Sequence, residues 1–147
     1  MSQQIRERFP RVYTITGDCQ QRLPFPDGFF DRILVVLVLE HLPDLPSTVR
    51  EMRRLCDPQL GGFSFVLPCE GGLVYTLARR FSAQRIFLKR YNQPYRWFIQ
   101  REHINAPDEI IAELERHFRI TQRAFFPLPL PFIFCNFCLG LTLNPSA

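Results

Sequence analysis

The chain has 147 residues, with 18 Lys and Arg against 14 Asp and Glu, which gives a formal net charge of +4. That length suits one domain, and a hydrophobic fraction of 46% is enough to build a core, which excludes wholesale disorder. Only 7 Gly and 5 Cys, without a heptad pattern, exclude collagen, coiled-coil and disulfide-knot proteins. The first ten residues are polar and hold no apolar signal-peptide core, so we expect a cytoplasmic protein with reduced thiols.

The first half of the chain predicts a strand–helix–strand unit. After a polar lead-in over residues 1–10, residues 11–16 (RVYTIT) predict a short strand rich in β-branched residues. Residues 30–39 are apolar almost throughout and do not alternate, which predicts a central parallel strand buried on both faces. A helix over residues 47–55 with one apolar face leads to a strand over residues 63–67, so these two strands should be parallel with a right-handed crossover.

Residues 71–101 form a basic segment with interleaved aromatic residues. The segment contains seven Arg and Lys and no Asp or Glu. It is either a solvated helical surface with the aromatic rings turned inward, or a surface that recognises a phosphate-bearing or lipid-linked molecule, including at an anionic membrane. Nucleic acid ranks lowest, because the whole chain carries only +4 and no nucleic-acid-binding motif occurs, so we expect no nucleic-acid partner.

The C-terminal third predicts a helix and two strands. Residues 107–118 form an amphipathic pattern that starts with Pro and two acidic residues, as helix N-termini favour. Residues 118–126 and 132–143 predict two buried strands. The apolar stretch 124–143 is nearly as long as the about 20 residues of a membrane helix, but its alternating Leu and Pro cannot form one. A contact with a membrane surface stays open.

Cys135 and Cys138 form a C-x-x-C pair inside this apolar stretch. On a strand, residues three apart point to opposite faces, and a zinc site needs two more ligands for which the other Cys and the His residues show no supporting spacing. We therefore expect buried thiols and no metal site.

Four ordered motifs carry a resemblance to a known family. They are Gly17-Asp18-Cys19, Leu23-Pro24-Phe25, Phe30-Asp31-Arg32-Ile33 and Leu39-Glu40-His41, followed by a helix and a turn ending in Gly61-Gly62. The set resembles class I S-adenosylmethionine-dependent methyltransferases of type 11, most strongly over residues 11–68. The resemblance implies an α/β, Rossmann-like methyltransferase fold, truncated at the N-terminus, with a mostly parallel sheet and an antiparallel C-terminal strand.

The resemblance also implies a cofactor site for S-adenosylmethionine. Asp18 would accept a hydrogen bond from the adenine and Cys19 would meet the ring, and Val36 would face the methionine part. Glu40 and His41 would lie near the transferred methyl, with His41 as general base for a hydroxyl acceptor. The alternatives are a turn-forming Asp18, a core Val36, and a Glu40–His41 pair that only orients the next loop.

Residues 71–101 fall where the family inserts substrate-recognition elements, which makes Arg90, Tyr91, Arg96 and His103 candidate acceptor-binding residues. For His103, a role at the start of the next helix is the alternative. The implied reaction is methyl transfer to a small-molecule or lipid- or glycan-linked acceptor.

The family's glycine-rich loop and its acidic ribose-binding residue have no counterpart in the sequence. Without the two strands that carry them, the strand over residues 33–39 becomes an open, apolar sheet edge, which is an aggregation hazard. We expect residues 1–147 to be one partial methyltransferase domain whose edge is covered by residues 11–16, by another chain or copy, or by a longer gene product. The alternative is a non-catalytic methyltransferase remnant that acts as an interaction module.

Overall fold

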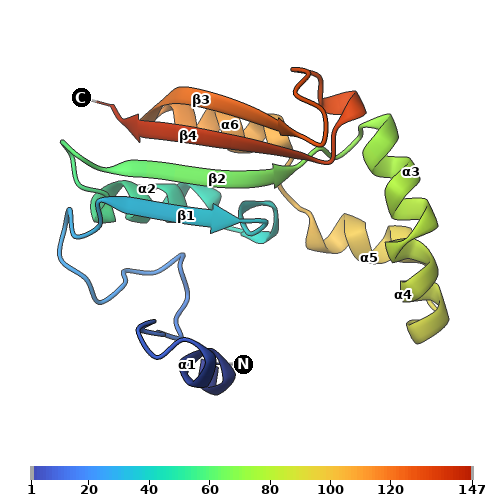
Figure 1. The fold of residues 1–147 in the computed structure, drawn as a ribbon, viewed down its shortest axis with the longest axis horizontal. Helices are drawn as coiled ribbons and strands as arrows, with labels where there is room; N and C mark the ends of the chain where they lie inside the picture. Colours follow the sequence, from blue (N-terminus) through green and yellow to red (C-terminus); the bar gives the residue numbers. More distant parts are fainter. Residues whose placement is uncertain (1, 147) are drawn as a thin grey trace.

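The computed structural model describes residues 2–146 and consists of a sheet with helices behind it and a helical arm at one end (Figure 1). The helices are α1 (Ser2–Arg8), α2 (Leu45–Leu55), α3 (Leu73–Phe81), α4 (Ala83–Tyr91), α5 (Tyr95–Glu102) and α6 (Pro107–Glu115), with short 3-10 turns η1 (Leu39–His41) and η2 (Ile133–Cys135). The strands are β1 (Arg32–Val36), β2 (Gly62–Pro68), β3 (Phe118–Phe126) and β4 (Cys138–Pro145).

The four strands form one sheet in the order β1-β2-β4-β3. β1 and β2 are parallel, with Ile33 opposite Phe63, and α2 connects them as the crossover helix. β4 lies antiparallel to both β2 and β3. The predicted α/β class, the parallel pair and the antiparallel C-terminal strand are therefore confirmed, and β1 is an edge strand.

The hydrophobic core lies between the sheet and the two helices α2 and α6, which Figure 1 shows on the same side of the sheet. Phe63 is fully buried at the centre, and its ring stacks on that of Phe118 with 5.1 Å between centroids. Other side chains with no exposed surface come from both helices and from β4: Val49, Ile110, Leu114 and Leu143. Burying these apolar surfaces stabilises the sheet–helix body.

Helix α2 confirms the predicted helix and begins two residues earlier. The Asp44 carboxylate accepts a hydrogen bond from the Ser47 backbone N–H at 3.0 Å, which caps the free N-terminal amides. This bond lowers the pKa of Asp44. On the opposite flank, the buried Glu51 carboxylate accepts bonds from Arg54 at 2.6 Å and from the Leu23 backbone N–H at 2.8 Å. The loop before β1 is thereby tied to α2.

Residues 11–16 are not a strand, so that prediction was wrong. The structure assigns them no strand, and Val12, Tyr13 and Ile15 are exposed. A β-branched sequence forms a strand only where a neighbouring strand supplies hydrogen bonds. Neither the open edge of β1 nor any other described strand pairs with these residues.

The strand predicted over residues 30–39 is shorter, and it is not buried on both faces. β1 spans Arg32–Val36, and Leu34 and Val36 are 66% and 49% exposed because they alternate with the two β1 residues that pack on the core and so lie on the face of the sheet that α2 and α6 do not cover. Leu37 then adopts a left-handed conformation, with φ of 52°, which ends the strand. A branched residue in this region carries backbone strain, and such residues often lie at functional sites.

The C-terminal strands differ from the prediction in two respects. β4 begins at Cys138, six residues later than expected, because residues 127–137 form a loop closed by the fully buried Asn136. Its amide donates to the Leu130 and Phe132 carbonyls at 2.9 and 3.0 Å, and its oxygen accepts from the Leu128 N–H at 2.8 Å. β3 matches its predicted bounds but, as an edge strand, is mostly exposed rather than buried.

The basic segment folds into α3, α4 and α5, which stand apart from the sheet at the end toward which β1 and β2 point (Figure 1). α3 and α4 contain no buried side chain. In the part of the chain that the structure describes, no helix is both long and apolar enough to cross a bilayer.

Candidate functional site

Open α/β sheets bind ligands at the carboxyl ends of their parallel strands, and here that end carries η1. Asn105, which follows the arm, fixes η1 by donating to the Leu39 and Leu42 carbonyls at 2.8 and 2.7 Å. The Glu40 carbonyl in turn accepts bonds from the Ile104 and Asn105 backbone N–H groups. The turn that carries Glu40 and His41 is therefore held against the segment after α5.

His41 is oriented by a backbone carbonyl. Its Nδ1 lies 2.7 Å from the carbonyl oxygen of Glu102. Because a carbonyl can only accept, Nδ1 carries the proton, and Nε2 of the neutral ring is left with a free lone pair. Nε2 lies 3.9 Å from Oε1 of Glu40.

The Glu40 side chain is buried, with 3% of its surface exposed. Its Oε2 atom has no hydrogen-bond partner among the described residues. A buried carboxylate oxygen without a partner costs free energy, so such an atom in a folded protein calls for a ligand or water. Its position in η1, the turn that follows β1, places this acceptor at the ligand-binding end of the sheet.

A second histidine joins His41. The rings of His41 and His103 meet edge to face, with 4.6 Å between centroids. Nδ1 of His103 lies 2.7 Å from Oε1 of Glu70, in ion-pair contact rather than in hydrogen-bond alignment. Arg79 approaches the same oxygen at 3.8 Å. The structure thus brings the predicted catalytic pair and the predicted acceptor residue His103 into one cluster, around the carboxyl ends of β1 and β2.

Tyr75 borders this cluster from α3. Burial, and to a lesser extent the nearby Glu70 carboxylate, raises the pKa of Tyr75 to about 12. The phenol therefore stays protonated at neutral pH and can donate a hydrogen bond. The Arg79 guanidinium lies over the Tyr75 and Tyr95 rings, at 5.7 and 5.8 Å from their centroids, which fixes the first turns of α3 and α5 relative to each other.

Asp18 and Cys19 lie in the loop before β1. Among residues 2–17 the structure has no strand, contrary to the prediction that Asp18 ends one. Its carboxylate accepts from the Gln20 backbone N–H at 2.9 Å and from the Gln20 amide at 3.2 Å, the geometry of a turn-forming Asp. Cys19 borders a small apolar hollow under this loop, where burial raises the pKa of its thiol.

The remaining predicted residues are not part of the histidine cluster. Val36 is half-exposed at the end of the open edge strand. Arg90 and Tyr91 end α4 at the tip of the arm, where the guanidinium of Arg90 lies 5.5 Å from the Tyr91 ring centroid. Arg96 is exposed in the first turn of α5.

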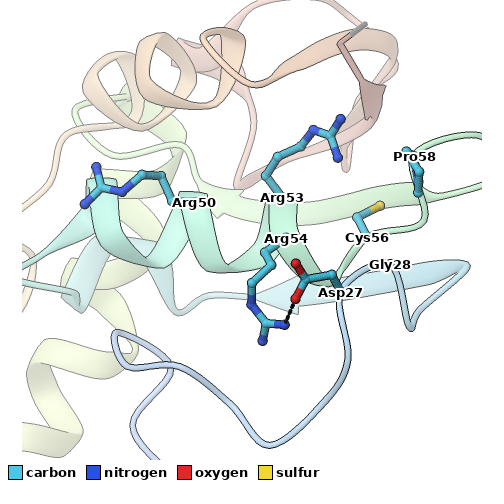
Figure 2. A pocket seen from close by; sticks show the side chains of 7 residues that line it. All are labelled: Asp27, Gly28, Arg50, Arg53, Arg54, Cys56 and Pro58. Atoms are coloured by element: carbon cyan, nitrogen blue, oxygen red, sulfur yellow. Dashed lines mark hydrogen bonds and ion pairs between the residues drawn. The ribbon is translucent and has the colours of Figure 1, made fainter.

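A separate hollow beside the end of α2 is lined by three arginines, and Figure 2 shows them pointing in three different directions. Arg54 is bound to Asp27 at 2.6 Å as well as to Glu51, and Arg53 donates to the Ser146 carbonyl at 3.3 Å. Arg50 bonds to the Ser47 hydroxyl at 2.8 Å. These engaged and divergent side chains brace the loop and the C-terminus and do not form an anion site.

The thiols are free, and three of them gather near the carboxyl end of β2. Burial raises the pKa of Cys69 to about 11 and also raises that of Cys138. Cys135 belongs to η2 rather than to a strand, contrary to the prediction for the C-x-x-C pair. Among residues 2–146, no group of three or more His, Cys, Asp or Glu side chains is placed to hold a metal ion.

Solved structures share this fold over nearly the whole chain. A Pyrococcus horikoshii protein aligns over 99% of this chain and 65% of its own, with a TM-score of 0.64 and 17% identity. A SAM-dependent methyltransferase from Aquifex aeolicus aligns over 97% and 60%, with a TM-score of 0.61 and 13% identity. The N-methyltransferase NodS from Bradyrhizobium japonicum, in complex with S-adenosyl-L-homocysteine, aligns over 99% and 62%, with a TM-score of 0.58 and 16% identity. The chain thus spans less than two thirds of each structure.

The fold is therefore the Rossmann-like fold of the S-adenosylmethionine-dependent methyltransferases. Residues 1–63 match the type 11 family model, described as a methyltransferase domain, which confirms the predicted resemblance over that part of the chain. No curated protein matches the sequence significantly.

Sequence reasoning missed the groups that surround the two histidines. Glu70, Tyr75, Arg79 and Asn105 lie on separate segments that only the fold brings together. One signal was present, since Glu70 directly follows the apolar residues of β2, at the carboxyl end where ligands bind.

Proposed function

We propose that the chain is part of an S-adenosylmethionine-dependent methyltransferase that transfers a methyl group to a small-molecule or lipid- or glycan-linked acceptor. The observation that carries this proposal is the orientation of His41. The Glu102 carbonyl fixes its tautomer, so Nε2 is left as a proton acceptor beside the Glu40 carboxylate. Together with the family match over residues 1–63, this geometry supports methyl transfer to an acceptor that must lose a proton.

The residues at the carboxyl end of the sheet fit the cofactor. S-adenosylmethionine, when bound, supplies an activated methyl group on a cationic sulfonium. The unpartnered Oε2 of buried Glu40 is an anionic acceptor suited to a cationic ligand. Asp18, Cys19 and Val36 would hold the adenine and methionine parts, as the family resemblance implies. The NodS structure, which shares the fold and contains S-adenosyl-L-homocysteine, supports S-adenosylmethionine as the cofactor.

His41 then acts as the general base in this proposal. Nε2 would take the proton that the acceptor loses, and Glu40, at 3.9 Å, would lie beside the resulting imidazolium. His103, packed against the His41 ring and paired with Glu70, lines the acceptor side. Tyr75 stays neutral there and can donate a hydrogen bond to an acceptor oxygen. Arg90, Tyr91 and Arg96 would contact a more distant part of the acceptor from the arm.

The open edge of β1 supports a second element of the proposal. Val36, an expected cofactor residue, lies on this edge and is 49% exposed. A strand paired there would satisfy the free backbone N–H and C=O groups of β1 beside the proposed position of the cofactor. We therefore propose that residues 1–147 bind the cofactor weakly until another strand, from the same or another polypeptide, completes the edge.

The reaction is tested by incubating the protein with S-adenosylmethionine that carries a tritiated methyl group. The label is then measured in a polar lipid extract and in an aqueous extract. Replacing His41 with Asn should lower incorporation by about 10²–10⁴-fold, the usual contribution of a general base. His117→Asn is the matched control, because His117 lies beside Glu113 at the start of β3, outside the cluster. Equal incorporation by the wild type and H41N would remove His41 as the base. If neither extract is labelled, even when a further strand pairs with the open edge of β1, the proposal of methyl transfer is overturned.

The alternative is a non-catalytic interaction module. The open β1 edge favours it, because unpaired strand N–H and C=O groups are a template for strand addition by a partner. This alternative predicts pairing with a partner strand and no S-adenosylmethionine binding in the resulting complex, whereas the methyltransferase proposal predicts stronger binding there.

A further inference from the structure

The arm exposes an apolar stripe where a helix of a globular protein would bury one. Leu73, Leu77 and Phe81 recur every four residues along α3, so they share one face, and they are 62%, 43% and 62% exposed. α4 and α5 continue the pattern with further half-exposed apolar side chains: Ile86, Leu88, Tyr91 and Trp97. Such a concentration of exposed apolar surface marks a contact site.

A second segment, distant in sequence, adds to the same end of the molecule. The proline-rich loop between β3 and β4 exposes a run of large apolar side chains: Phe126, Leu128, Leu130, Phe132, Ile133 and Phe134. This loop packs against the start of α3, where Gly72 is so close that a Cβ there would lie 2.6 Å from the Ile133 carbonyl oxygen. Figure 1 shows η2 beside the first turn of α3. We call the arm and this loop together the apolar–basic end.

The charge of this end is mostly positive and lies on the arm, where Glu102, the last residue of α5, is acidic, whereas the proline-rich loop carries no charge. Residues 71–101 contain seven Arg and Lys and no acidic residue. Within the described part of the chain, Arg79 is the one basic residue of the segment in an ion pair, with Glu70. The other six are exposed on the arm: Arg80, Arg85, Lys89, Arg90, Arg96 and Arg101. Three of these lie over exposed rings, at 4.9 Å for Arg101 on Trp97, 5.3 Å for Arg85 on Phe81 and 5.5 Å for Arg90 on Tyr91.

We propose that the apolar–basic end docks on a lipid bilayer that contains acidic phospholipids. Apolar and aromatic side chains would enter the boundary between headgroups and acyl chains, while arginines beside them bind lipid phosphates. A second copy of the chain is a poor occupant, because two positive surfaces would face each other. Single-stranded nucleic acid suits the charge and the exposed rings, but the exposed aliphatic side chains, such as Leu77, Ile86 and Leu130, favour the acyl-chain boundary of a bilayer.

Docking of the apolar–basic end on a bilayer does not require the chain to transfer methyl groups. Because the arm follows directly from the carboxyl end of β2, docking would hold the His41–His103 cluster near the bilayer. A lipid-linked acceptor would then reach the cluster without leaving the membrane surface.

Trp97 is the only tryptophan of the chain and is 55% exposed on α5, so its fluorescence reports on docking directly. Vesicles of equal parts phosphatidylglycerol and phosphatidylcholine should shift its emission to shorter wavelength and should carry the protein in sedimentation. Vesicles of phosphatidylcholine alone should do neither. Raising the salt to about 0.5 M should weaken binding, because exposed charges are then screened.

Two matched double variants separate this surface from the general charge of the protein. Arg85→Glu with Lys89→Glu on α4 should weaken vesicle binding by about 30-fold or more. Arg50→Glu with Arg119→Glu makes the same charge change at exposed positions on α2 and β3 and should bind as the wild type does. Leu77→Ser with Phe81→Ser should abolish the Trp97 shift while leaving urea unfolding of the body unchanged.

Several results would overturn the proposal. The proposal fails if the protein does not bind acidic vesicles, or if it binds both vesicle types equally. It also fails if the two charge variants lose binding equally. A Trp97 shift that depends on protein concentration without vesicles would indicate a second copy as the occupant. Preferential binding of single-stranded RNA over acidic vesicles would assign the surface to nucleic acid instead. None of these results depends on methyl transfer, so they leave the proposed reaction to its own test.

Discussion

The sheet–helix body and the helical arm differ in how their apolar residues are used. In the body, α2 and α6 bury residues such as Val49 and Ile110 completely against the sheet. In the arm, α3 and α4 bury none, although α3 has a clear apolar face. The body thus contains the interactions that stabilise it, whereas the arm presents its apolar face outward. The body is a packed scaffold, and the arm is the surface that we propose for docking.

The largest predicted effect concerns the body. Phe63→Ala would remove a ring that has no exposed surface and stacks on Phe65 and Phe118. We expect a loss of about 3–5 kcal/mol in the free energy of unfolding, because the lost transfer energy and the cavity add together. Urea unfolding followed by circular dichroism measures it. A loss below about 1 kcal/mol would show that the core of the body does not centre on this ring.

A smaller effect is expected at the junction of the two regions. Asn136→Ala would leave the Leu128 N–H and two carbonyls of the proline-rich loop without their bonds. We expect a loss of about 2 kcal/mol or more, since several backbone groups lose partners at a buried position. Asn144→Ala, an exposed Asn on β4, is the control and should change the free energy of unfolding by less than about 0.5 kcal/mol.

A pH effect is expected where α2 holds the loop before β1. Hydrogen bonds from Arg54, and more weakly from the Leu23 N–H, lower the pKa of Glu51 below its usual 4.5. Because the folded-state pKa is the lower one, Glu51 stabilises the fold above about pH 4.5, and this contribution is lost as the pH falls through the folded-state value. Glu51→Gln should cost about 1 kcal/mol at pH 7, the difference between charged and neutral bonds, and should flatten stability against pH in the acid range. An unchanged slope would exclude Glu51 from acid unfolding.

The smallest effect should come from the arm itself. Phe81→Ala removes a ring that is 62% exposed, so we expect the free energy of unfolding to change by less than about 0.5 kcal/mol. Comparison with Phe63→Ala, the same substitution in the body, tests the difference between the two regions directly. A loss above about 2 kcal/mol would show that the arm packs as part of the core.

The sequence correctly predicted those elements whose local residue pattern favours the same helix or strand that their neighbours in the fold stabilise. The apolar face of residues 47–55, the Pro and acidic residues at the start of α6, and the bounds of β3 all appear in the structure. Residues 11–16 failed because a strand depends on a neighbour that local sequence cannot supply. The apolar run over residues 30–39 correctly suggested a strand but not its burial, which depends on whether both faces of the sheet are covered.

The candidate site was partly predictable for the same reason. Glu40, His41 and His103 were identified in the sequence, and the structure places all three in one cluster. The bond from His41 to the Glu102 carbonyl and the contact of His103 with Glu70 join residues 61 and 33 positions apart, so no local motif contains them. Arg90 and Tyr91 fell in the expected segment, but the direction in which α4 leaves the body is a tertiary property.

The central claim is that the carboxyl end of the sheet binds the methyltransferase cofactor. This claim is tested by titrating the ¹⁵N-labelled chain with S-adenosyl-L-homocysteine up to several millimolar. The amide chemical shifts are recorded at each concentration, so that weak binding is also detected. The account predicts saturable shifts at Asp18, Cys19, Val36, Glu40 and His41, with a dissociation constant well above the micromolar range. Micromolar affinity would contradict the proposed need for a further strand. Absence of shifts, or shifts confined to residues elsewhere in the chain, would contradict the cofactor site itself.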